Sequence, residues 1–84
     1  MSCKGRTPDE KFLIKVYEVA LAKGDPCLPV DYYSVAKSLG QKETAIKNIV
    51  KHLAQANFVK KINDMTLSLT KLGCQFVLNE LNEE

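Results

Sequence analysis

The stretch "LGQKETAIKNIVKHLAQANFV" (residues 39–59) decides the fold of this chain. It opens with a Leu-Gly pair, which is typical of a helix end because glycine adopts the left-handed conformation without strain. Behind it, one apolar stripe recurs at helical spacing, made of Ile46, Ile49, Val50 and Leu53. The pattern predicts a helix over residues 42–57 that starts at Lys42 or Glu43 and has Asn57 as its C-terminal cap.

Two further helices are predicted upstream of this stretch. Thr7-Pro8-Asp9-Glu10 has the residues of a capping box, and the apolar spacing behind it predicts a first helix that Gly24 ends. Asp31 is a good N-cap for a short helix over residues 32–39, which Gly40 ends. Between the two helices, the prolines of residues 25–29 exclude a regular helix, so this segment is expected to be a connector.

Downstream of residue 57 the apolar period changes to two. Residues 58–62 and 65–69 flank Asn63-Asp64, which predicts a β-hairpin with a tight two-residue turn. In that register Lys61 points to one side, and the other side carries Phe58, Lys60, Ile62, Met65, Leu67 and Leu69. Thr70 is expected to cap a last helix, from Lys71 to about Leu81.

Length and composition bound the class of protein. The chain has 84 residues, which indicates a single domain over 1–84, with flexible ends at 1–6 and 82–84. With 45% hydrophobic and 26% charged residues, the composition is that of a globular protein. No apolar stretch is long enough to span a bilayer, and no signal peptide is apparent. We therefore expect a cytoplasmic protein without a membrane partner.

The cysteines and the histidine give little sign of chemistry. Cys3, Cys27 and Cys74 are odd in number and far apart, and His52 is the only histidine, which makes a poor metal set and a poor disulfide framework. We expect reduced thiols, with Cys74 packed in the core. Because no catalytic triad or glycine-rich phosphate loop can be assembled, we expect no enzyme, no cofactor and no metal.

The positive charge is concentrated in one part of the chain. The net charge is only +2, but residues 37–71 hold seven lysines against two acidic residues, a charge of +5. The remainder of the chain carries −3. This asymmetry indicates an anionic partner for the segment that contains the third helix and the hairpin.

The order of helix, helix, tight turn, helix, hairpin and helix resembles the winged helix-turn-helix family over residues 7–81. The resemblance rests on "SVAKSLGQKETAIKNIVKHLAQANFVKKI" (34–62) and "LSLTKLGCQFV" (67–77). Within the second stretch, residues 69–73 are similar to the "LT-x-x-G" of small MarR-type and PadR-type regulators. The resemblance implies a mainly α fold with a small β-hairpin wing: a three-helix core, a two-stranded wing and a C-terminal helix.

Three positions depart from the family pattern. Gln41 replaces an apolar residue of the turn, Lys42 stands where Ser or Thr usually caps the second helix of the motif, and Asn57 replaces a glycine. The first two bear on the geometry of the turn. The third is physically mild, because asparagine tolerates the left-handed conformation.

The face opposite the apolar stripe suits DNA. Helical geometry places Thr44, Lys47, Asn48, Lys51 and Gln55 there. The resemblance implies that this helix docks in the major groove. Lys42, Thr44 and Asn48 are then the candidates for reading base edges, and Lys47 and Lys51 for phosphates. The alternative is that this face is simply solvated surface.

The hairpin supplies the remaining candidates. The resemblance implies that Lys61 and Asn63 contact the DNA backbone, with Lys60 as a further contact. The alternative for the two lysines is protection of an exposed strand edge against aggregation.

Two functions are compatible with these features. The first is a small transcriptional regulator that binds double-stranded DNA. Its first and last helices are apolar over more than one stripe, and this excess is either the interface of a homodimer or simply the core of a small domain. The second is a protein–protein interaction module without DNA binding, because a fold does not fix a function.

Overall fold

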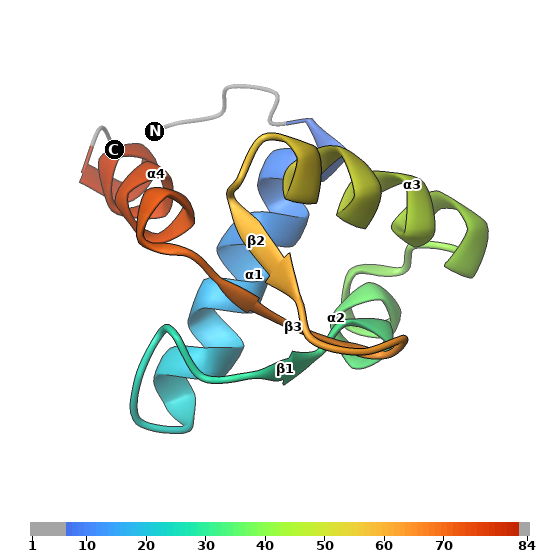
Figure 1. Ribbon diagram of the computed structural model, residues 1–84, viewed down its shortest axis with the longest axis horizontal. Helices are drawn as coiled ribbons and strands as arrows, with labels where there is room; N and C mark the ends of the chain where they lie inside the picture. Colours follow the sequence, from blue (N-terminus) through green and yellow to red (C-terminus); the bar gives the residue numbers. More distant parts are fainter. Residues whose placement is uncertain (1–6, 83–84) are drawn as a thin grey trace.

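The computed structural model describes residues 7–82 as four helices and a small antiparallel sheet (Figure 1). The helices are α1 (Pro8–Ala22), α2 (Tyr32–Leu39), α3 (Glu43–Gln55) and α4 (Lys71–Asn82). The strands are β1 (Val30–Asp31), β2 (Val59–Lys61) and β3 (Thr66–Leu69). The four predicted helices are confirmed. Asn82, expected in a flexible tail, is the last residue of α4, and the flexibility expected at 1–6, 83 and 84 lies outside the described residues.

The helix ends follow from local sequence. The Thr7 hydroxyl accepts the Glu10 N–H at 3.2 Å, and Glu10 Oε1 accepts the Thr7 N–H at 3.2 Å, which confirms the capping box of α1. The Asp31 carboxylate accepts the Tyr33 N–H at 2.9 Å and caps α2. Gly40 ends α2 with a φ of 71°, the left-handed conformation predicted for it.

One hydrophobic core lies between all of these elements. In Figure 1, α1 runs through the middle of the molecule, with α2 and α3 on one side of it and α4 on the other. The side chains of Phe12 and Val16 on α1 are completely buried, as is Ile46 on α3. Together with the buried faces of β3 and α4, they make the single cluster that holds the helices in place.

The sheet has a strand that the sequence reading missed. β1 pairs antiparallel with β3, with Val30 opposite Leu67, so the strand order is β1-β3-β2 rather than that of a two-stranded hairpin. The pairing continues in a hydrogen bond of 3.0 Å from the Tyr32 N–H to the Met65 carbonyl. A strand of two residues has no periodicity to recognise, and its partner lies more than 30 residues away.

The hairpin is also one residue out of the predicted register. Val59 lies opposite Leu69, and Lys61 lies opposite Leu67. The connection is therefore longer than the predicted Asn63-Asp64 turn. The Thr66 carbonyl accepts the Ile62 N–H at 2.8 Å, which leaves residues 63–65 as the loop.

This shift reverses the predicted faces of β2. Because side chains alternate along a strand, a slip of one residue moves every side chain to the other face. Val59 is buried beside Leu67 and Leu69, whereas Ile62 is 48% exposed. The prediction that Phe58, Lys60 and Ile62 share a face with Leu67 and Leu69 was therefore wrong, and the buried Val59 determines the register.

α4 starts in close contact with the corner that follows α3. Asn57 adopts a φ of 66° directly after the C-cap of α3, which is Ala56 rather than Asn57 itself. The Phe58 carbonyl accepts the Thr70 N–H at 3.1 Å, while the Thr70 hydroxyl donates to the Asn57 carbonyl and accepts the Gly73 N–H at 3.1 Å. Thr70 thereby caps α4 as predicted and also ties it to this corner.

The two departures in the turn between α2 and α3 have visible consequences. The Gln41 N–H donates to the Ala36 carbonyl at 2.9 Å, but within residues 7–82 its buried Oε1 has no hydrogen-bond partner. An unpaired buried polar atom of this kind costs about 1–3 kcal/mol. Lys42 is the N-cap residue of α3 and makes no side-chain capping bond, unlike the Ser or Thr that it replaces in the family pattern.

Gly73 is the residue on which the contact between α4 and Phe58 depends. A Cβ atom at this position would lie far inside van der Waals distance of the Phe58 carbonyl oxygen, a backbone atom with little freedom to move. We expect Gly73→Ala to destabilise the protein by about 2 kcal/mol or more, because the overlap outweighs the ~1 kcal/mol that alanine gains in a helix. Urea unfolding of both proteins measures the difference.

The matched control is Gln75→Ala, at an exposed position of the same helix. It should change the free energy of unfolding by less than about 0.5 kcal/mol. If Gly73→Ala were as stable as this control, the close approach of α4 to Phe58 would be disproved.

Candidate nucleic-acid interface

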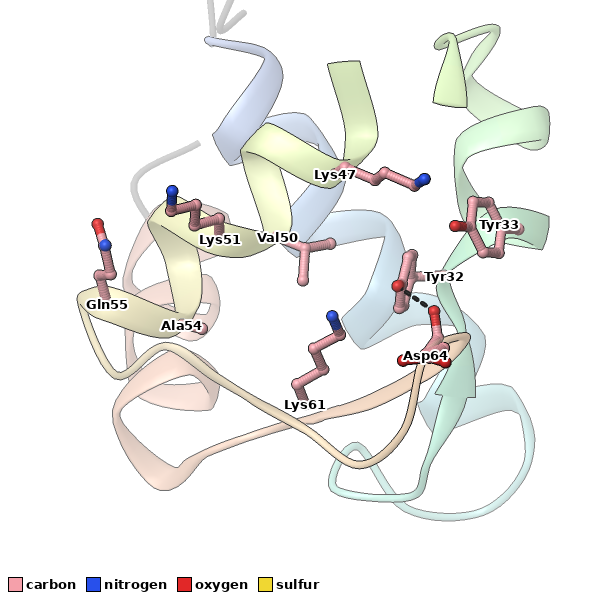
Figure 2. Close-up of a pocket in the computed structure, with 9 residues that line it drawn as sticks. All are labelled: Tyr32, Tyr33, Lys47, Val50, Lys51, Ala54, Gln55, Lys61 and Asp64. Carbon is pink, nitrogen blue, oxygen red and sulfur yellow. Dashed lines mark hydrogen bonds between the residues drawn. The ribbon is translucent and has the colours of Figure 1, made fainter. Parts of the chain in front are cut away.

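A groove of about 750 Å³ separates α3 from the hairpin (Figure 2). We call the hairpin, which comprises β2, β3 and residues 62–65, the wing. The start of α2 closes one end of the groove, with Tyr32 and Tyr33. The other lining residues come from α3 and the wing: Lys47, Val50, Lys51, Ala54, Gln55, Lys61 and Asp64.

Three lysines surround this groove. In Figure 2, Lys61 points from the wing towards α3, Lys47 extends from α3 towards Tyr33, and Lys51 extends outwards. All three side chains are exposed, and Asp64 is the one acidic residue in the lining of the groove. The groove therefore carries an excess of two positive charges, which favours an anionic ligand.

The register of the wing determines which wing lysine belongs to the groove. Lys61 follows the buried Val59 by two residues, so its side chain leaves β2 on the side that faces α3. Lys60 leaves β2 on the opposite side and does not line the groove. Of the two wing lysines in the predicted site, the structure thus brings only Lys61 together with Lys47 and Lys51.

The predicted base-reading residues lie outside the groove. Thr44 and Asn48 are exposed and stand one turn apart on the side of α3 that faces away from the core. Lys42 is exposed at the N-terminus of the same helix. Since no side chain caps this end, the first N–H groups of α3 have no side-chain acceptor.

Asn63 has a structural role that the sequence reading did not foresee. Its side-chain oxygen accepts the Met65 N–H at 2.9 Å, and its own N–H donates to the Thr66 carbonyl at 3.2 Å. These bonds shape the wing loop, as asparagine commonly does in turns. Its amide oxygen is thus occupied within the loop.

Tyr32 fastens the wing loop to α2. Its side chain is buried, and its hydroxyl donates a hydrogen bond to the carbonyl of Asp64 (Figure 2). Burial raises the pKa of Tyr32 above its ordinary value of 10.0, and Tyr33 and Asp64 add to the shift. The half-buried Tyr33 lies against Tyr32, with the two ring centroids 4.8 Å apart, and lines the groove.

Replacing Tyr32 tests this attachment. At neutral pH we expect Tyr32→Phe to destabilise the protein by about 1 kcal/mol, because the hydrogen bond to Asp64 is lost. A raised pKa means that the folded state favours the protonated phenol, so its contribution is present below pH 10 and is lost as the pH rises further. The free energy of unfolding, measured with denaturant at pH 7 and above pH 10, should fall less between the two pH values for Tyr32→Phe than for the wild type.

Tyr17→Phe is the control, because Tyr17 lies in the core and its hydroxyl makes no hydrogen bond within the described residues. If the free energy of unfolding fell equally above pH 10 for the wild type and for Tyr32→Phe, the role given to Tyr32 would be contradicted.

None of the helices within residues 7–82 has the length and apolarity needed to cross a membrane. Comparison of the chain with protein-family models, with curated proteins and with solved structures gave no match. The resemblance to the winged helix-turn-helix family therefore stays a prediction from the sequence, and the observed order of helices and strands is compatible with it.

Proposed function

We propose that the protein is a winged helix-turn-helix DNA-binding protein, a small transcriptional regulator that acts in the cytoplasm. The observation that carries the proposal is that Lys47, Lys51 and Lys61, from two separate elements, all line one groove. A solvated helix face or a protected strand edge gives no reason for lysines of both elements to gather at the same place. A polyanion that fits between α3 and the wing does.

The exposed side of α3 has the residue types that base recognition requires. Asn48 can pair bidentately with adenine, and Thr44 can offer its hydroxyl or its methyl group. Both are exposed and lie in the first half of α3, the part that meets base edges in helix-turn-helix docking. Lys42 and the uncapped first N–H groups of α3 add donors for a base edge or a phosphate at the same end.

Binding to DNA should depend strongly on salt. Each phosphate neutralised by a lysine contributes about −0.9 to the slope of log K against log salt. We expect Lys47→Ala, Lys51→Ala and Lys61→Ala each to weaken binding of a random duplex and to reduce the slope by about 1. Fluorescence anisotropy between roughly 50 and 200 mM salt measures both quantities.

Lys23→Ala is the matched control, because Lys23 is an exposed lysine at the C-terminal end of α1 and does not line the groove. It should leave the slope within error of wild type. If the three groove variants behaved as this control does, DNA would not bind in the groove. The change in slope for Lys60→Ala should be smaller than for the groove variants and larger than for Lys23→Ala, because Lys60 belongs to the wing but leaves β2 on the side away from the groove.

The proposal includes a homodimer through α1 and α4. A single small module gives limited affinity and specificity, and a two-fold operator needs two copies. On α4, Leu78 and Leu81 are 41% and 37% exposed and stand three residues apart on one side of the helix, and α1 adds the exposed Leu21. These side chains are the apolar surface that a second copy would cover.

Leu78→Glu should therefore shift the protein from dimer to monomer in sedimentation experiments without unfolding it, because the glutamate would be buried unpaired in the dimer. Leu72→Glu, on the other flank of α4, is the control and should leave the oligomeric state unchanged. If the wild-type protein is a monomer at all concentrations, the homodimer is disproved, and the proposal of DNA binding is unaffected.

The same exposed leucines favour a second candidate function, a protein-interaction module that uses α4. The two candidates differ in their dependence on salt. An apolar interface on α4 holds its affinity as salt rises, whereas DNA binding through the lysines does not.

A further inference from the structure

Two cysteines that are 47 residues apart in the sequence meet in the fold. The sulfur atoms of Cys27 and Cys74 lie 3.7 Å apart, in contact, with one thiol donating to the other. Cys27 belongs to the connector between α1 and β1, and Cys74 to the first turns of α4. Both are free thiols in this structure. The two cysteines are free, as expected, but their separation in the sequence does not keep them apart in the fold.

The contact arises from features that fix each thiol from its own side. The Asp25 carboxylate accepts the Cys27 N–H at 2.7 Å, and the Asp25 carbonyl accepts the Leu28 N–H at 3.1 Å, which folds the connector into a turn. Cys74 follows directly after Gly73, whose close approach to Phe58 fixes the start of α4. A disulfide needs the sulfur atoms at about 2.05 Å, so the two thiols must move closer together to form one, and Cys27 lies in an exposed turn.

The two thiols differ in their surroundings. Cys27 is exposed, whereas Cys74 is half-buried and packs against the core, in line with the prediction for it. Burial, the hydrogen bond from Cys27 and the nearby charges of Cys27 and Asp25 raise the pKa of Cys74 to about 11. Since the thiolate is the reactive form, Cys74 is protected from direct attack, and a reagent in solution meets Cys27 first.

We propose that Cys27 and Cys74 form a redox-active thiol pair, which closes to an intramolecular disulfide by exchange with a small disulfide such as oxidised glutathione. In the first step the Cys27 thiolate attacks glutathione disulfide, forms a mixed disulfide and releases one glutathione thiolate. The Cys74 thiol then loses its proton to solvent, attacks the Cys27 sulfur and releases the second glutathione thiolate. Two protein thiols are oxidised, and one glutathione disulfide is reduced to two glutathione thiols.

The bond would close a ring around the part of the chain that carries the proposed DNA site. The segment between Cys27 and Cys74 contains α2, α3 and the whole wing. Cross-linking its ends restricts the unfolded chain, and the restriction grows with the length of the closed segment. Because neither cysteine lines the groove between α3 and the wing, the disulfide should stabilise the fold and leave the groove lysines in place.

The test uses the 84-residue chain with Cys3→Ser, so that Cys27 and Cys74 supply its only thiols. The reduced protein is incubated in glutathione buffers of increasing oxidised fraction and quenched with an alkylating reagent. We expect a product that has lost two hydrogen masses, takes up no alkylating reagent and yields a linked Cys27–Cys74 peptide. Its melting temperature should lie on the order of 10 °C above that of the reduced protein.

The single variants separate the steps. Cys74→Ser should stop at a stable mixed disulfide of Cys27 with glutathione, and Cys27→Ser should react slowly, because the remaining thiol is half-buried with a raised pKa. Neither variant should show the rise in melting temperature that the Cys27–Cys74 disulfide gives. The proposal is overturned if the pair stays fully alkylatable in the most oxidising buffer, or if the linked peptides join two molecules. Both readouts are independent of DNA, so either proposal can fail without the other.

Discussion

The structure depends on the contact between the backbone of Gly73 and the carbonyl of Phe58. Only glycine lets the first turn of α4 come this close, and the same carbonyl accepts the N–H of Thr70. The residues directly before and after the wing, Phe58 and Thr70, are thereby joined by a hydrogen bond. From this point the chain enters β2 and leaves β3 with Val59 opposite Leu69, so the register of the whole wing is fixed at its base.

The wing is held at its far end as well. β1 pairs with β3, and the buried hydroxyl of Tyr32 donates to the carbonyl of Asp64 in the loop. A two-stranded hairpin alone is marginally stable in water, so these attachments give the wing a defined position beside α3. The groove between Lys47 and Lys61 depends on this position of the wing, and the two tyrosines at the start of α2 line one end of it.

The lysine groove and the thiol pair lie in different parts of the molecule. In Figure 1, α3 and α4 stand on opposite sides of α1, and the thiol contact joins α4 to the connector below it. Oxidation of the thiols and binding of an anion in the groove therefore have no side chain in common. Gly73 lies between them, since its close approach to Phe58 places the start of α4, which carries Cys74, against the base of the wing.

The sequence by itself determined the features that depend on neighbouring residues. The capping box at Thr7, the end of α2 at Gly40 and the cap at Thr70 rest on hydrogen bonds and backbone conformations within a few residues. The apolar stripe of α3 was equally readable, because a period of 3.6 over thirteen residues is a strong signal. The placement of Lys47 and Lys51 on its polar side followed from that stripe.

The tertiary structure alone decided the features that depend on contacts between distant residues. A strand of two residues carries no pattern, so β1 could not be read from the sequence. The register of the wing is set by which of Phe58 and Val59 finds a buried site, and a slip of one residue exchanges Lys60 for Lys61 at the groove. The contact of Cys27 with Cys74 requires α4 and the connector to meet, which no local spacing encodes.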